Sequence, residues 1–162
     1  LLPGCNRAKP ENSMTGRAMQ SPGDLPAVAT GLGRLGLIPF VALAAGVGFG
    51  VGNDDLLYKA LAAYSFGILA FLLGAWWGLA LIRRQPSALL LSNAIFLVVF
   101  FSYLGMGHSS FFILAAVVFL LLLVIERRHP LFRQQPDYYA RMRAQLSVTA
   151  ALALLFSAGI SG

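Results

Sequence analysis

The chain alternates long apolar runs with short polar segments. Five runs are almost free of acidic and basic residues, the exception being Lys59 near the start of the second run. These runs cover about residues 35–52, 56–82, 87–106, 109–125 and 144–160. A helix needs about 20 residues, within a range of about 17–25, to cross the hydrocarbon of a bilayer. The pattern therefore predicts an all-α fold, an integral membrane bundle of five transmembrane helices.

The residues before the first run differ in composition. Residues 1–30 are rich in Pro, Gly, Ser and Asn and show no apolar period, which is typical of disorder. We therefore predict a disordered N-terminal tail at 1–30 and a five-helix transmembrane domain at 31–162. The whole chain is 58% hydrophobic and 11% charged, whereas soluble domains are about 45–50% apolar and about 25% charged.

Basic residues are distributed unevenly around the five runs. Four of the twelve lie before or at the start of the first run, two between the second and third, and five between the fourth and fifth. All of these positions fall on one side of the membrane, and Lys59 falls on the other. Short loops rich in Lys and Arg stay in the cytoplasm. We therefore expect a cytoplasmic N-terminus and an external C-terminus, and no binding of nucleic acid.

Small residues recur along one face of the second run. Gly67, Ala70, Gly74 and Gly78 follow one another at intervals of three or four residues, and we call them the small-residue stripe. Helices in lipid associate by close van der Waals approach, which small side chains permit. Since the first run also carries glycines at four-residue spacing, we expect the first two helices to pack through this stripe.

Polar and amphipathic side chains gather in the cytoplasmic third of the expected bundle. Trp76, Trp77, Asn93 and Thr149 each lie about 8–10 Å from the inner boundary of their run, at about 1.5 Å per residue. An amide group in hydrocarbon requires a hydrogen-bond partner. This inner polar layer is therefore either a set of interhelical hydrogen bonds or a shallow pocket for a lipid head group or small ligand.

Four arginines would surround the opening of such a pocket. Arg83 and Arg84 follow the second run, and Arg141 and Arg143 precede the fifth. Guanidinium groups near the membrane surface attract anionic head groups, so we expect these four side chains to form a rim for an anionic group.

The reactive side chains show no arrangement typical of catalysis. Asp54 and Asp55 are adjacent, so a helix directs them about 100° apart, and they suit a helix cap. His108 and His129 fall on opposite membrane faces and cannot share a metal. Two arginines follow Glu126 directly and account for its charge. We therefore expect no enzymatic activity, no metal and no cofactor.

Several segments resemble a known membrane family. They are Leu35–Phe40, then Tyr64, Ile68, Leu69, Phe71, Leu72, Gly74, Trp77 and Gly78, then Pro86 and Ser87, and finally Pro136, Tyr139, Arg141, Arg143 and Leu146. In this set the chain is similar to the family catalogued as domain of unknown function 3429. Trp76 is a departure, because the family often has His there. The resemblance implies five helices in a bacterial or mitochondrial inner membrane, and it implies no activity.

These observations favour a non-enzymatic protein of the inner membrane that binds membrane lipid, a membrane-protein partner or further copies of itself. The alternative is a subunit of an oligomeric transporter or channel for small solutes, since five helices are few for a pathway within one monomer. In a bacterium the location would be the inner (plasma) membrane, and in a eukaryote the mitochondrial inner membrane.

Overall fold

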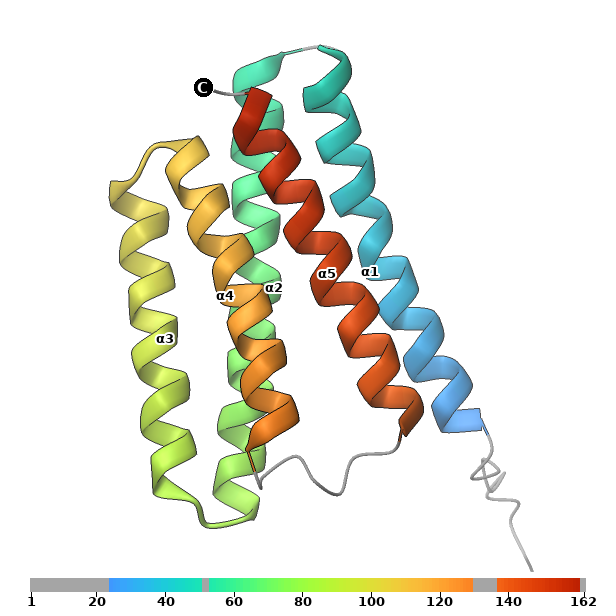
Figure 1. The fold of residues 1–162 in the computed structure, drawn as a ribbon, viewed down its shortest axis with the longest axis vertical. Helices are drawn as coiled ribbons and strands as arrows, with labels where there is room; N and C mark the ends of the chain where they lie inside the picture. The colour runs from blue at the N-terminus through green and yellow to red at the C-terminus, as the bar shows by residue number, and fades with distance from the viewer. Residues whose placement is uncertain (1–23, 51–52, 130–136, 161–162) are drawn as a thin grey trace, which may run out of the picture.

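The computed structural model describes residues 24–50, 53–129 and 137–160, which form five α-helices (Figure 1). The helices are α1 (Asp24–Phe49), α2 (Asp54–Ile82), α3 (Pro86–Gly105), α4 (His108–Arg128) and α5 (Asp137–Ile160). All five are long and apolar enough to cross a membrane, and the described part of the chain contains no strand. The prediction of an all-α membrane bundle of five helices is confirmed.

Two helices begin well before the apolar runs that predicted them. α1 starts at Asp24, inside the predicted tail, of which residues 1–23 lie outside the described part of the chain. α5 starts at Asp137, seven residues before the expected boundary at residue 144. An apolar run marks the hydrocarbon layer, whereas backbone hydrogen bonding continues a helix into the polar interface. The other boundaries agree with the expected ones to within three residues.

Local interactions fix the start of α2. Asn53 is the N-cap, and its side-chain oxygen accepts a hydrogen bond from the backbone N–H of Leu56 at 3.4 Å. Asp55 forms an exposed ion pair with Lys59 one turn later, at 2.6 Å. Acidic side chains in the first turn also complement the helix dipole. The only basic residue within the apolar runs is therefore paired beside a helix end.

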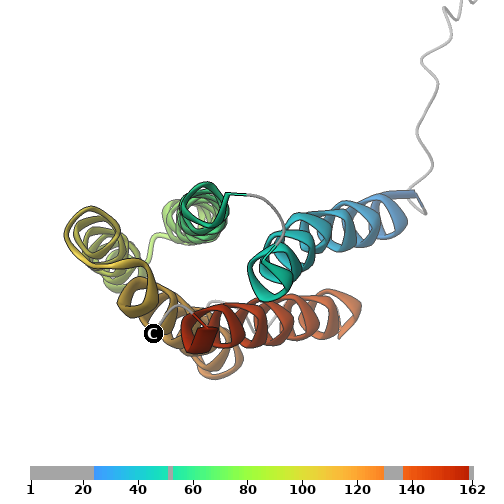
Figure 2. The ribbon, with the colours of Figure 1, turned by 90° about the horizontal axis from the view of Figure 1, so that it is seen from above.

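The helices form a bundle in which α4 and α5 lie side by side, with α2 across from them (Figures 1 and 2). α3 lies at one side against α2, and α1 lies at the other against α5. The α2–α3 turn, the end of α4 and the starts of α1 and α5 share one end of the bundle (Figure 1). We call this the basic end, because it carries Arg83, Arg84, Arg127 and Arg128.

α4 is the central helix of the core. Its side chains Phe111, Phe112, Phe119 and Leu122 are almost completely buried, and Leu154 of α5 packs in the same cluster. In hydrocarbon the outside of a helix is no less apolar than its neighbours, so dispersion contacts rather than water exclusion favour this packing. The shape of the aromatic side chains therefore determines how the helices fit together.

Near its middle, α1 contacts both α2 and α4. The ring of Phe40 packs edge-to-face against Tyr64 of α2 at 5.1 Å and against Phe119 of α4 at 5.8 Å. The Tyr64 hydroxyl donates a hydrogen bond to the Gly36 carbonyl of α1 at 2.7 Å. These contacts join α1, α2 and α4 at one level.

The expected packing of α1 on α2 through the small-residue stripe is wrong. A Cβ added at Gly67, Gly74 or Gly78 would meet no atom within 4 Å, so no helix approaches these glycines closely. α1 instead packs most extensively against α5. A Cβ at Gly48 would lie 2.7 Å from the ring of Phe156 of α5. The close helix contact is therefore made by a glycine of α1 with a large side chain of α5.

The two glycine environments predict different responses to the same substitution. Gly48→Leu forces α1 and the Phe156 ring apart, and overpacking of this kind costs about 1–3 kcal/mol. Gly74→Leu is the matched control, because its side chain enters open space, and it is expected to change stability by no more than about 0.5 kcal/mol. Unfolding in mixed detergent–SDS micelles measures both. Equal losses for the two variants would contradict the α1–α5 contact.

Candidate functional site

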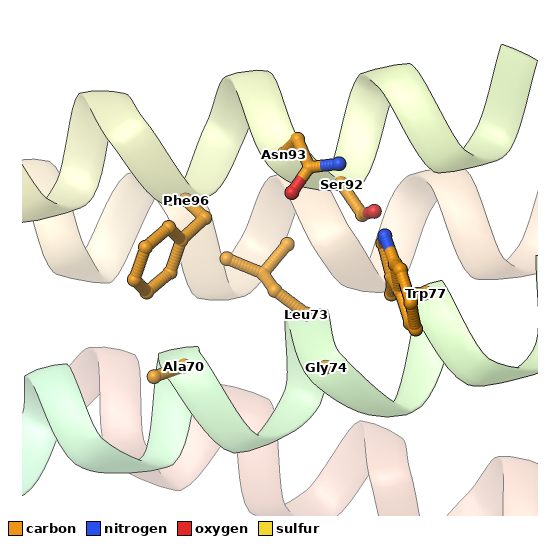
Figure 3. A pocket seen from close by; sticks show the side chains of 7 residues that line it. All are labelled: Ala70, Leu73, Gly74, Trp77, Ser92, Asn93 and Phe96. Atoms are coloured by element: carbon orange, nitrogen blue, oxygen red, sulfur yellow. The ribbon is translucent and has the colours of Figure 1, made fainter.

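The inner polar layer predicted from the sequence is divided between separate places. Trp77 of α2 and Asn93 of α3 line a recess of about 200 Å³ together with Ser92 (Figure 3). Figure 3 shows the Trp77 ring directed toward Ser92 and Asn93. The side chains of Ser92 and Asn93 both donate to the Leu89 carbonyl of their own helix, at 2.9 and 3.2 Å. This recess is a gap between α2 and α3, bounded by parts of the small-residue stripe.

The other two members of the layer lie elsewhere. Trp76 is buried and faces α4, where its indole N–H donates to Glu126 at 2.7 Å. Thr149 lies on α5, twelve residues after Asp137, or about 18 Å along the helix at about 1.5 Å per residue. The structure therefore brings Trp77 and Asn93 together, and separates both from Trp76 and Thr149.

A buried ion pair between Glu126 of α4 and Arg143 of α5 lies beside Trp76. Arg143 donates through Nε to Glu126 Oε2 at 3.2 Å, and through Nη2 to Oε1. The two side chains are only 8% and 6% exposed. The indole of Trp76 completes the site by donating to Oε1 as well. We call these three residues the buried charge cluster, and it joins α2, α4 and α5.

The sequence pattern suggested other roles for both charged residues of this cluster. Glu126 pairs across to α5 rather than with the arginines that follow it, and Arg127 and Arg128 are exposed. Helical spacing could have shown that Glu126 faces the interior of the bundle. Glu126 lies four residues after Leu122 and seven after Phe119, and both are buried. A residue at that spacing shares their inward face.

The predicted rim of four arginines is not a single ring of exposed charge. Arg143 was expected to be an exposed member of the rim, but it is buried in the ion pair. Arg141, two residues earlier, is exposed. Arg83 and Arg84 lie at the α2–α3 turn, where Arg84 has a left-handed backbone with φ of 53°. The two pairs therefore belong to different parts of the basic end.

An apolar cavity lies between α1, α2 and α5, with Phe119 of α4 as part of its wall. Its volume is about 400 Å³. The walls are almost entirely apolar, and three polar side chains interrupt them, all on α5. The lining residues are Leu32, Gly33, Gly36, Leu37, Phe40, Ile68, Phe71, Leu72, Phe119, Tyr139, Met142, Arg143, Leu146, Ser147 and Ala150. No local sequence pattern signals this cavity, since it arises from the separation of α1 and α2.

The mouth of this cavity opens on the side of the bundle. Leu32 of α1 and Phe71 of α2 line it and are 65% and 72% exposed. Figure 2 shows α1 diverging from α2 while it stays beside α5. The cavity therefore opens sideways, between α1 and α2, rather than along the bundle axis.

At the opposite end of the bundle, His108 takes part in aromatic packing. The His108 ring lies 6.0 Å from Tyr58 and 6.4 Å from Phe112. Among residues 24–50, 53–129 and 137–160, no three His, Cys, Asp or Glu side chains are placed to hold a metal ion.

Together the fold and its interior define a five-helix membrane protein with a lateral apolar cavity and a buried charge cluster. The family model described as "Protein of unknown function (DUF3429)" matches residues 25–159, so the chain belongs to this family. No curated protein and no solved structure matches the chain.

The buried charge cluster predicts a strong dependence of each charge on the other. Arg143→Met leaves Glu126 as an unpaired buried charge and is expected to cost about 3–5 kcal/mol. The double variant Glu126→Leu/Arg143→Met removes both charges and should lose less stability than the single one. Unfolding in mixed micelles measures each variant, with exposed Arg127→Met as the control. A double variant that loses as much stability as Arg143→Met, or more, would show that the two charges are not coupled.

Proposed function

We propose that this protein is a non-enzymatic lipid-binding protein of the membrane, which holds a lipid chain in the cavity between α1, α2 and α5. The cavity is the observation that supports the proposal. Its volume of about 400 Å³ lies within the range of ligand sites, about 300–1,000 Å³. Its apolar walls suit a hydrocarbon ligand.

The surroundings of the cavity favour the same ligand. Water gains little along the apolar walls of α1 and α2, because a buried water needs about three polar partners. An empty cavity forfeits dispersion contacts along its whole lining. A lipid chain can enter sideways between Leu32 and Phe71 without leaving hydrocarbon, and it restores those contacts. Lipid is also the most concentrated ligand around a membrane protein.

The proposal includes an orientation and a location. We place the basic end in the cytoplasm, because Arg83, Arg84, Arg127 and Arg128 gather there and short basic loops are retained inside. The membrane would be the bacterial inner membrane, or the mitochondrial inner membrane in a eukaryote.

Cysteine labelling tests the orientation. Cys5 is the only cysteine, so Cys5→Ser provides a background for Ser87→Cys near the basic end and Met106→Cys at the other end. Both positions are exposed. A membrane-impermeant maleimide is expected to label Met106→Cys in intact cells and Ser87→Cys only after lysis. The reverse pattern would overturn the orientation.

Filling the cavity tests lipid binding. A Cβ at Gly36 would meet only the Tyr64 hydroxyl, at 3.8 Å, so Gly36→Leu directs a side chain into the cavity without a close clash. We expect native mass spectrometry of the purified full chain to show at least about tenfold less bound lipid, since the ligand and leucine compete for one volume. Gly31→Leu, on the same helix in open space, is the control.

Two results would count against this proposal. One is equal lipid retention by Gly36→Leu and Gly31→Leu. The other is a parent protein that carries no lipid and instead forms a defined oligomer or complex, which would support the binding of copies or of a membrane partner.

A further inference from the structure

The polar residues of the cavity form a line along α5. Tyr139, Arg143 and Ser147 are spaced four residues apart and all line the cavity. Residues at this spacing lie above one another on a helix face. Tyr139 is nearest the basic end, Arg143 is one turn deeper, and Ser147 is one turn deeper again. We call this set the α5 polar line.

The α5 polar line offers hydrogen-bond donors that no residue of the described chain engages. Ser147 is 3% exposed, and its hydroxyl has no hydrogen-bond partner among the residues that the structure describes. Glu126 engages Nε and Nη2 of Arg143, whereas Nη1 carries two further donors. No fully enclosed polar atom in the described chain lacks a partner, so the Ser147 hydroxyl opens onto the cavity.

A hydroxyl that opens onto the cavity without a partner in the described chain can bind a ligand. Buried polar groups are almost always hydrogen-bonded, so a ligand acceptor at Ser147 would follow that rule. Water is a poor partner here, since the opposite walls are the apolar side chains of α1 and α2. The group that completes this site must bring hydrogen-bond acceptors into an otherwise apolar cavity, so it belongs to an amphiphile.

The cavity has a polarity gradient that matches such a molecule. Its end nearest the basic end contains Tyr139 and Arg143, while its deep end is formed by Phe40, Ile68 and Phe119. A lipid whose head group lies against α5 would extend its chain toward the deep end. The head group would then sit among donors, and the chain would meet only apolar side chains.

The donor geometry of Arg143 and the charge of Arg34 favour an anionic head group. Trp76 donates to Glu126, and Glu126 accepts from Arg143, so the Arg143 guanidinium is held in one orientation before a ligand binds. Arg pairs with phosphate oxygens in planar geometry. Arg34, which adjoins the lining residue Gly33, adds an exposed positive charge near the mouth.

We propose that the cavity selects an anionic glycerophospholipid, whose phosphate accepts hydrogen bonds from the α5 polar line of Tyr139, Arg143 and Ser147. This inference rests on the proposed lipid-binding function and adds the class of lipid. Arg143 thus acts in two ways, since Nε and Nη2 stabilise the bundle through Glu126 and Nη1 binds the head group.

Lipid competition on the full chain tests the inference. Native mass spectrometry compares binding of phosphatidylglycerol and phosphatidylethanolamine with identical acyl chains. We expect the parent protein to prefer phosphatidylglycerol. Tyr139→Phe and Ser147→Ala should each weaken phosphatidylglycerol binding on the order of tenfold or more, the effect of losing a hydrogen bond to a charged group. Binding of phosphatidylethanolamine should change less, because the ammonium group of its zwitterionic head group already pairs with the phosphate and weakens each further hydrogen bond to it.

The controls match both the chemistry and the burial of these residues. Tyr138→Phe removes a hydroxyl from an exposed tyrosine outside the cavity. Ser157→Ala removes a buried hydroxyl that already donates to the Ala153 carbonyl at 2.9 Å. Neither should alter lipid preference. Arg143 itself is left intact, since its loss exposes Glu126 as an unpaired charge.

The outcomes separate this inference from the proposed function. Equal affinity for the two lipids, or unchanged preference in Tyr139→Phe/Ser147→Ala, overturns the anionic head-group site while leaving the lipid chain in the cavity. Lipid retention that Gly36→Leu does not reduce overturns both.

Discussion

The ion pair between Glu126 and Arg143 is the interaction on which the arrangement of the basic end depends. Two opposite charges are buried between helices, where each alone would be costly, and each is tolerated because the other is in contact. Trp76 adds a third helix to the pair. The cluster thus positions α5 against α2 and α4, and with α5 it positions the wall of the cavity.

The cavity follows from how α1 is attached. α1 follows α5 closely, with Gly48 against Phe156, and it meets α2 through Tyr64 and Phe40 at mid-height. Toward the basic end α1 stays with α5 and diverges from α2 (Figure 2). The separation leaves a volume that the side chains of Leu32 and Phe71 border but do not fill.

The sequence predicted the helices well and their neighbours poorly, for a physical reason. Apolar run length follows from bilayer thickness, so the spans could be recognised one at a time. Helix pairing depends on the shapes of side chains distant in sequence. The small-residue stripe around Gly74 suggested a close contact between α1 and α2, whereas Gly48 of α1 makes a close contact with α5.

Arg143 was placed outside the fifth span because of its charge, but Glu126 of α4 neutralises that charge. The spacing of Glu126 after Phe119 and Leu122 could have shown that it faces inward. The cavity could not have been predicted, because it is a gap between three helices.

The contact between Glu126 and Arg143 also has an electrical consequence. A voltage across a membrane does work on net charge, about 2.3 kcal/mol per elementary charge per 100 mV. Here a negative and a positive charge touch, so the forces of the field on them nearly cancel. The cluster is therefore almost indifferent to voltage, and its geometry is expected to be the same in an energised membrane and in a membrane without a potential.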